Sequence, residues 1–94
     1  MGDLPTADIL RVAERFGATR VTLFGSRARG DSRPDSDVDL LVEVGPETSL
    51  FDLLRMEEEL EGLLGVTVQV LTPGGLDAEF QQTILEEGRV LSVA

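Results

Sequence analysis

Two aspartates separated by one residue are the side chains in this sequence best suited to bind a metal ion. Asp37 and Asp39 open the segment 37–44, in which apolar residues alternate with the others at the period of a β-strand. Both carboxylates should therefore face the same way, with their Cα atoms about 6.6 Å apart. Such carboxylates repel each other unless a cation lies between them, and Mg²⁺ is usually held by one or two carboxylates together with substrate phosphates. The spacing predicts a Mg²⁺ site, although a polar outer strand face would also carry such residues.

A glycine-serine pair, ten residues before Asp37, is suited to bind a phosphate. It follows a β-rich run at residues 20–24, and Gly25 ends that run. A glycine at a strand-to-helix corner lets a phosphate approach the backbone, and the first N–H groups of a helix have no intrahelical partner. Ser26 adds a hydroxyl donor, and Arg27 or Arg29 can add charge. A Gly-Ser pair also marks ordinary turns, so its pairing with the two aspartates is what favours phosphate binding.

These residues resemble the signature of the DNA polymerase β-like nucleotidyltransferases, which is Gly-Ser, ten residues, then Asp-x-Asp. The fuller form, GSRARG followed by Ser-Asp-x-Asp-Leu, is similar to the minimal nucleotidyltransferases, whose chains are little more than this domain. The resemblance implies one domain over residues 1–94 with an α/β (α+β) polymerase β-like fold, a mixed sheet with helices mainly on one side. The alternation of expected helices and strands independently favours α/β.

The resemblance also implies an activity and its site. A minimal nucleotidyltransferase would take ATP with Mg²⁺ and transfer AMP to an acceptor hydroxyl. The resemblance implies that the acceptor is a small HEPN-type helical protein of a toxin–antitoxin pair. Asp37 and Asp39 would ligate the metal and carry catalysis. The nucleotide would be bound by the residues of the glycine corner and the loop before the aspartates, namely Gly25, Ser26, Arg27, Arg29 and Ser36.

The third carboxylate of that family is where this chain departs. The family commonly has an aspartate in a Val-Asp-Leu-Val-Thr-Pro pattern, and the matching position here is Gln69, in a strand expected over residues 65–72. Gln69 can coordinate through its amide oxygen, but it carries no charge and cannot act as a base. A polar residue on a sheet surface would look the same in sequence. Three hypotheses follow: an adenylyltransferase, a catalytically weak or inactive module that neutralises a helical partner by binding, and an acidic domain whose motif is accidental.

Composition excludes several other classes. The 94 residues carry a net charge of −10 and no cysteine or histidine, so a disulfide framework, a thiol nucleophile and a zinc site built on histidine are absent. Extended nucleic-acid binding is not expected without a broad basic surface. No apolar run approaches the roughly 20 residues of a membrane helix, and the first five residues lack signal-peptide character; we expect a cytoplasmic protein. Four of the eight arginines fall within residues 20–33 and suggest a local anion site.

The remaining segments are expected to form the scaffold. Ile9, Val12, Ala13 and Phe16 predict a helix that Gly17 ends. Ser49 and Asp52 resemble a capping box that opens a helix to Leu64, stopped by Gly65. Its acidic residues, Glu57, Glu58, Glu59 and Glu61, predict a solvated face. A last helix is expected over residues 77–87 with Phe80, Ile84 and Leu85 inward, followed by a short strand or packing tail that includes Val90, Leu91 and Val93.

Overall fold

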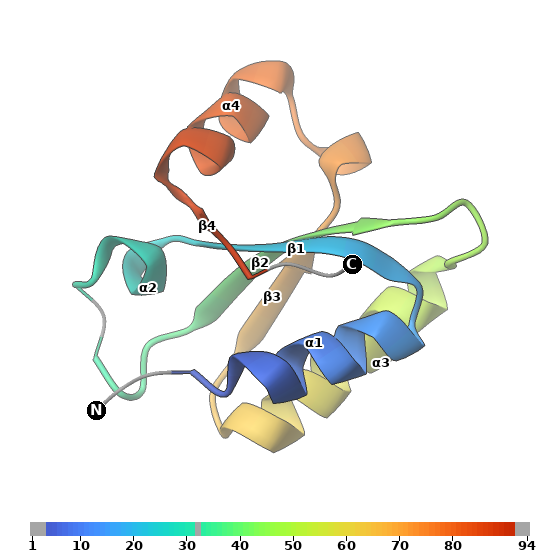
Figure 1. Cartoon of the computed structure of the whole chain (residues 1–94), viewed down its shortest axis with the longest axis horizontal. Helices are drawn as coiled ribbons and strands as arrows, with labels where there is room; N and C mark the ends of the chain where they lie inside the picture. Colours follow the sequence, from blue (N-terminus) through green and yellow to red (C-terminus); the bar gives the residue numbers. More distant parts are fainter. Residues whose placement is uncertain (1–3, 32, 92–94) are drawn as a thin grey trace.

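Four strands form one mixed sheet in the computed structural model, which describes residues 4–31 and 33–91. The strands are β1 (Ala18–Phe24), β2 (Val38–Val44), β3 (Val68–Leu71) and β4 (Arg89–Val90), and their order is β3-β2-β1-β4 (Figure 1). β1 runs antiparallel to β2 and β4, whereas β2 and β3 are parallel. The predicted mixed sheet is confirmed.

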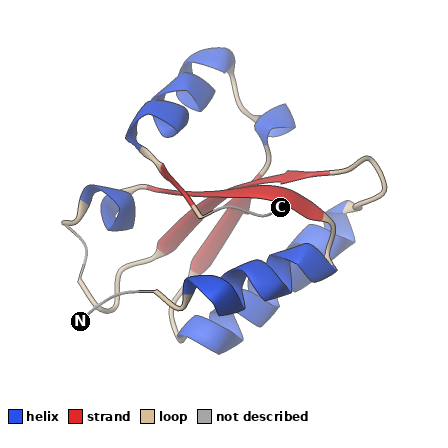
Figure 2. Ribbon diagram, viewed as in Figure 1, coloured by secondary structure: helices blue, strands red, loops and turns tan. Residues whose placement is uncertain are grey.

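The two helices that pack against the main core lie on one face of this sheet. α1 (Thr6–Arg15) and α3 (Leu50–Leu64) pack beneath it, and α4 (Ala78–Glu87) lies over the opposite face (Figure 2). One turn of helix, α2 (Ser26–Arg29), follows β1, and a short 3₁₀ turn, η1 (Pro73–Gly75), follows β3. Helices therefore lie mainly on one side, as expected, with α4 as the exception.

The main core fills the space between the sheet and the helices α1 and α3. The alternation in the strands selects the inward side chains, because every second residue faces the same way. Leu23, Leu40 and Val68 are buried from three adjacent strands, and Met56 and Leu60 of α3 are fully buried against them. The face predicted from Val21 and Leu23 is thus confirmed as the core face.

Local signals place the ends of α3 where the sequence predicted them. Ser49 accepts a hydrogen bond from the Asp52 N–H (3.2 Å), and the Asp52 carboxylate accepts one from the Ser49 N–H (2.9 Å). Aspartate therefore completes the capping box in place of glutamate. Gly65 ends the helix with φ 74°, a conformation that glycine adopts without steric cost.

The acidic residues of α3 have a role that the sequence analysis did not predict. β3 is an edge strand, so its outward N–H groups have no neighbouring strand to bind. Glu61 accepts a hydrogen bond from the Val68 N–H (3.0 Å), and Glu57 accepts one from the Val70 N–H (2.8 Å). Glutamate side chains on such an edge discourage pairing with another strand. The prediction of a solvated acidic face is therefore wrong for these two residues.

The second face of the sheet is partly covered, and this changes two further expectations. Leu41, on the face expected to be polar, is 2% exposed because η1 and α4 pack on β2 and β1 there. Ile84 of α4 is buried as predicted, but Leu85 is 48% exposed and Phe80 is 42% exposed, so the inward prediction is wrong for these two residues. A ten-residue helix lying on a sheet buries a narrow stripe, and Leu85 falls outside it.

Two strand predictions differ from the structure in length. β3 begins at Val68 rather than at residue 65, because its pairing partner β2 begins at Val38. Residues 65–67 instead connect α3 to the sheet, and the Thr67 carbonyl accepts the Val38 N–H (2.9 Å). The final strand is confirmed as the two residues of β4, with Leu91 packed on the core; Val93 lies outside the described residues.

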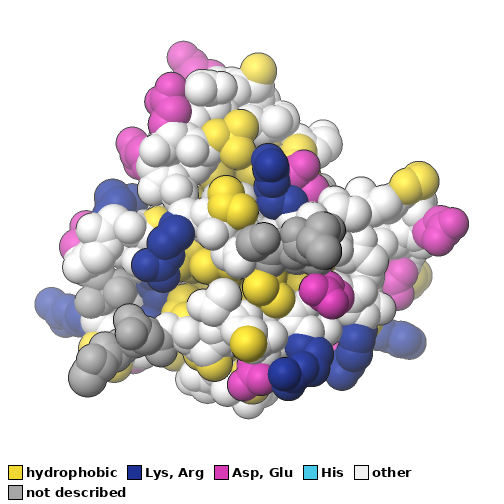
Figure 3. Space-filling view, in the orientation of Figure 1, with side chains coloured by type: hydrophobic (Ala, Val, Ile, Leu, Met, Phe, Trp, Pro, Cys, Tyr) yellow, Lys and Arg dark blue, Asp and Glu magenta, His cyan; other side chains and the backbone are white. Residues whose placement is uncertain are grey.

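Two further observations concern the charge on one face of the molecule and the length of its helices. On the face drawn in Figure 3, basic and acidic side chains of the described residues are interspersed, and the basic ones form no continuous surface. Among residues 4–31 and 33–91, no helix has the length and apolar character needed to cross a bilayer.

Candidate nucleotide and metal site

The sheet topology brings the predicted site residues together at one end of three strands. β1 is antiparallel to β2, so the carboxyl end of β1 meets the amino end of β2; β3 is parallel to β2, so its amino end lies there too. Asp39 is paired in register with Phe24 on one side and with Gln69 on the other. Gly25 follows Phe24 directly. Residues 25, 39 and 69 thus converge, although 44 positions separate the first from the last.

Gly25 is in close contact with the carboxylate of Asp39. Its backbone has φ 77° and ψ −156°, a region that is essentially open only to glycine. A Cβ added to Gly25 would overlap Oδ2 of Asp39, with Cγ of the same side chain 3.3 Å away. The Gly-Ser motif predicts that a phosphate approaches the backbone at this glycine. The structure adds that its bare backbone is what allows the Asp39 carboxylate to lie against the corner.

The electrostatic environment of Asp39 fits a site for a cation. Burial raises the pKa of the Asp39 carboxyl above its ordinary value, and the negative charge of Asp37 raises it further. The positive charge of Arg29 acts in the opposite direction on the same pKa. A half-buried carboxylate beside a second one is unfavourable by itself and is relieved by a bound cation. Carboxylate and amide oxygens, the groups that Asp37, Asp39 and Gln69 could offer, are among the hard oxygen ligands that Mg²⁺ accepts.

Arg27 and Ser36 hold the loop that leads to the aspartates. The Arg27 guanidinium donates from Nε (3.2 Å) and Nη2 (2.7 Å) to the Ser36 carbonyl oxygen, and from Nη2 to the Pro34 carbonyl oxygen (3.0 Å). Ser36 Oγ accepts a hydrogen bond from the Arg33 N–H (2.7 Å). These bonds fix the approach to Asp37. Direct contacts of Arg27 and Ser36 with a nucleotide stay a prediction.

The cluster of arginines is not assembled into one anion site. Arg20 forms an exposed ion pair with Glu43 (3.7 Å), and Arg29 forms another with Asp31 (3.4 Å). Arg27 is occupied by the loop carbonyls described above. The positive charge of Arg29 acts to lower the raised pKa of Asp39, and the Arg29 side chain is largely exposed. It is therefore the arginine best placed to meet a phosphate at this corner.

Gln69 stands at the position where the family resemblance expects the third carboxylate. It pairs directly with Asp39, its side chain is exposed, and neighbouring parallel strands lie about 4.8 Å apart. In the part of the chain that the structure describes, no three or more acidic, histidine or cysteine residues are grouped as metal ligands. The residue paired with Asp39 on β3 therefore carries a neutral amide rather than a third carboxylate.

Two features of the site could not be found by sequence reasoning. The Gly25–Asp39 approach and the Arg27 clamp on the loop both join residues through tertiary geometry. A third long-range contact lies nearby: the rings of Phe24 and Phe80 meet edge to face with centroids 6.3 Å apart. This contact helps to hold α4 beside the glycine corner. The sequence indicated these contacts only through the GSRARG motif, which contains Gly25 and Arg27 but not their partners.

Replacing Gly25 with alanine is expected to weaken ATP·Mg²⁺ binding more than the same change at Gly30. Both glycines have positive φ, 77° and 83°, so both variants carry backbone strain, about 1–2 kcal/mol at Gly30 in the left-handed region and about 1–3 kcal/mol at Gly25 in its glycine-only region. Only at Gly25 would the new Cβ displace the Asp39 carboxylate, because nothing lies within 4 Å of a Cβ at Gly30. Calorimetric titration with ATP and Mg²⁺ measures the difference; equal affinities for the two variants would contradict the assignment.

The raised pKa of Asp39 predicts how stability and binding depend on pH. The folded state holds this proton more tightly than the unfolded state does, so the contribution of Asp39 to stability is present at low pH and is lost as pH rises through the raised pKa. Asp39→Asn should therefore gain stability over the parent as pH rises toward neutrality.

ATP·Mg²⁺ affinity should fall on acidification, because protons compete with the metal. Thermal denaturation and titrations over a pH series test both; a parent–variant difference that is constant with pH would refute the assignment.

Comparisons with known proteins agree with this geometry. Residues 9–91 match the family model of the nucleotidyltransferase domain. The protein adenylyltransferase MntA of Thermococcus cleftensis is 39% identical over 82 residues, which cover 87% of this chain and 83% of that protein. A solved structure whose proposed identity is a minimal nucleotidyltransferase is 42% identical, with a TM-score of 0.81 and coverage of 88% of this chain and 85% of that one.

A more distant solved structure shares the fold. It is an MNT antitoxin in complex with the tri-AMPylated HEPN toxin of Shewanella oneidensis, 17% identical, with a TM-score of 0.76 and coverage of 100% of this chain and 74% of that chain. At this identity the likeness concerns the fold alone. The family model and the closer relatives carry the assignment: this chain belongs to the nucleotidyltransferase domain family, a family of enzymes.

Proposed function

We propose that this protein binds ATP with Mg²⁺ and transfers AMP to a hydroxyl group of a small HEPN-type helical protein. The observation that carries the proposal is the position of Asp39. It lies against Gly25, is influenced by the charge of Asp37, and is paired in register with Gln69. This supports the proposal, because the backbone that we expect to bind phosphate and the carboxylates that we expect to bind metal lie at one end of the sheet.

Each residue has a role that its position supports. Asp37 and Asp39 would hold Mg²⁺, which would supply positive charge to offset the phosphate charge that develops during transfer. The backbone and hydroxyl of Ser26, next to Gly25, bind the outer phosphates, and Arg29 adds positive charge. The acceptor hydroxyl gives its proton to solvent as its oxygen forms a bond to the α-phosphorus, and the bond from the α-phosphorus to the bridging oxygen breaks, so that this oxygen leaves with pyrophosphate. Catalysis by positioning and electrostatics needs little else from the protein.

The nature of the acceptor is supported by the relatives. The 39% identical relative is named a protein adenylyltransferase, which favours a protein as the acceptor here. The structure with the shared fold is a complex in which the HEPN toxin carries the AMP groups. An acidic protein without a broad basic surface is also poorly suited to nucleic-acid acceptors.

A second function is favoured by one observation, the neutral side chain at position 69. Without a third carboxylate, the site lacks the group that would ligate the metal and assist deprotonation of the acceptor. The chain could then bind ATP·Mg²⁺ and a helical partner while transferring AMP slowly or not at all. It would neutralise the partner by binding.

Transfer of label from ATP to the partner separates the two functions. The protein is incubated with ATP labelled on the α-phosphate and with a HEPN-type protein encoded in the same genome. Label on the partner that disappears with Asp39→Asn would support transfer. Binding of nucleotide and partner without label would support the second function. Absence of both ATP·Mg²⁺ binding and partner binding would refute both.

A further inference from the structure

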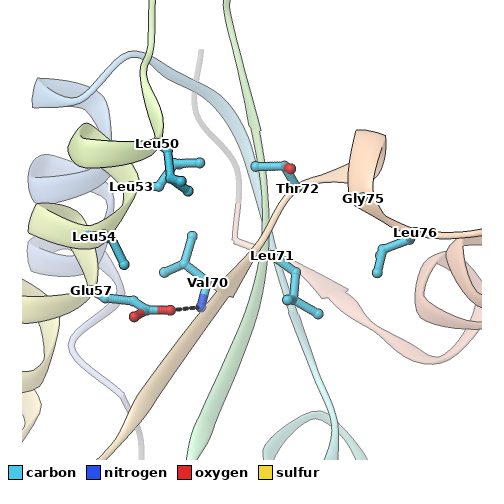
Figure 4. A pocket seen from close by; sticks show the side chains of 9 residues that line it. All are labelled: Leu50, Leu53, Leu54, Glu57, Val70, Leu71, Thr72, Gly75 and Leu76. Carbon is cyan, nitrogen blue, oxygen red and sulfur yellow. Dashed lines mark hydrogen bonds between the residues drawn. The ribbon is translucent and has the colours of Figure 1, made fainter.

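An apolar groove runs along the edge of the sheet at the carboxyl end of β3. Its walls come from Leu50, Leu53 and Leu54 of α3 and from Leu76 after η1, and Val70 and Leu71 of β3 form its floor (Figure 4). We call these residues, with Glu57, the α3–β3 groove. The groove crosses the edge strand, because its two floor residues lie on opposite faces of the sheet. Val70 packs against the core, and Leu71 lies on the face that carries Gln69.

The amino-terminal half of α3 is far more exposed than a core helix would be. Leu50 is 71% exposed and Leu54 is 50% exposed, and Phe51, the next residue along α3, is 77% exposed. These are three of the seven large hydrophobic side chains that are exposed among the described residues, and they lie within five positions. Concentrated exposed apolar side chains next to a groove mark a binding surface rather than chance exposure.

Charge indicates what kind of partner this surface accepts. α3 carries five carboxylates and a single arginine. The Glu57 carboxylate lines the groove itself and accepts the Val70 N–H, which keeps it in place there (Figure 4). A second copy of the chain docking by the same surface would bring carboxylates against carboxylates. A partner with cations beside its apolar side chains is complementary to both features.

We propose that the α3–β3 groove docks an amphipathic helix of a partner protein, with apolar side chains at helical spacing and Lys or Arg residues flanking them. This rests on the proposed function for its consequence, because the floor of the groove, Val70 and Leu71, directly follows Gln69 along β3. Docking would then hold the acceptor protein at the edge of the nucleotide site. Apolar anchors at i, i+3, i+4 and i+7 are the usual pattern for a helix in a groove.

The test uses a defined probe rather than an unidentified partner. A fluorescent synthetic helix carries leucines at i, i+3, i+4 and i+7 with arginines on both sides of that stripe, and its binding is followed by anisotropy. Leu54→Asp should weaken binding about tenfold or more, since it puts a charge where an apolar anchor sits. Leu85→Asp is the matched control, because Leu85 is 48% exposed on α4, outside the groove; it should bind as the parent does.

Charge complementarity has its own control. A probe of the same apolar pattern with glutamates in place of the arginines should bind at least about tenfold more weakly, and added salt should weaken only the arginine probe. Equal binding of the two probes, or equal effects of Leu54→Asp and Leu85→Asp, would overturn the proposal. So would a parent dimer in sedimentation that Leu54→Asp dissociates, because the occupant would then be a second copy.

Nucleotide binding is measured on the same variants so that the two proposals fail separately. Leu54→Asp should bind ATP·Mg²⁺ with parental affinity, because Leu54 does not belong to the nucleotide site. A parent that binds no ATP·Mg²⁺ but discriminates between the probes as expected would refute the proposed function and retain the docking groove. A parent that binds ATP·Mg²⁺ but binds neither probe would refute the docking groove and retain the proposed function.

Discussion

The double variant Asp37→Asn, Asp39→Asn is expected to lose ATP·Mg²⁺ binding by at least about 100-fold while keeping its fold. Both carboxylates would be direct ligands of the metal, and an amide oxygen carries no charge to replace them. Affinity for ATP in the parent should depend on Mg²⁺, and in the variant that dependence should disappear. Calorimetric titration with and without Mg²⁺ measures both effects.

A control variant distinguishes loss of the site from loss of charge. The double variant Asp8→Asn, Glu14→Gln also removes two negative charges, but it removes them from α1, which lies on the other face of the sheet. It should bind ATP·Mg²⁺ as the parent does. If the Asp37, Asp39 variant also binds like the parent, the metal site is elsewhere and the proposed function loses its basis.

The Asp37, Asp39 variant should also be at least as stable as the parent without ligand. The substitutions remove the mutual repulsion of the carboxylates and the cost of burying the charge of Asp39. Adding ATP·Mg²⁺ should stabilise the parent and leave the variant unchanged, because only the parent would bind it. Thermal denaturation of parent and variant, with and without ATP·Mg²⁺, measures both differences in stability.

Replacing Gln69 with aspartate is expected to raise the rate of AMP transfer by about 10²–10⁴-fold, the usual size of general-base assistance. The new carboxylate would lie beside Asp39 in the paired strand register. There it can ligate the catalytic metal and help to deprotonate the acceptor hydroxyl. The parent should bind ATP·Mg²⁺ yet transfer AMP slowly. Single-turnover transfer to the same HEPN-type protein measures parent and variant.

Gln82→Asp is the matched control for this gain, since it adds the same charge at an exposed position of α4. Its transfer rate should equal that of the parent. A parent that is already fast and is unchanged or slowed by Gln69→Asp would show that a carboxylate is not needed there. A Gln69→Asp variant that stays inactive would favour the binding function. Without Mg²⁺ the variant should be less stable than the parent, because a like charge then faces Asp39.

Features governed by local sequence were predicted well. The ends of α3 followed from its capping box and from Gly65, because these interactions join residues within one turn. The core faces of β1 and β2 followed from alternation, which depends only on the two-residue period of a strand. The Gly-Ser and Asp-x-Asp motifs indicated the family that the comparisons confirm. The ligands of metal and nucleotide remain predictions that the experiments above test.

Tertiary structure decided what depends on which strands are neighbours. Sequence alone does not say that Gln69 pairs with Asp39, or that a Cβ at Gly25 would meet the Asp39 carboxylate. Nor does it say that β3 is an edge, and so Glu57 was expected in solvent although it binds the Val70 N–H. Hydrophobic periodicity specifies which side of an element is apolar. The element that will cover that side, or leave it open as in the α3–β3 groove, is set by the packing of segments distant in the chain.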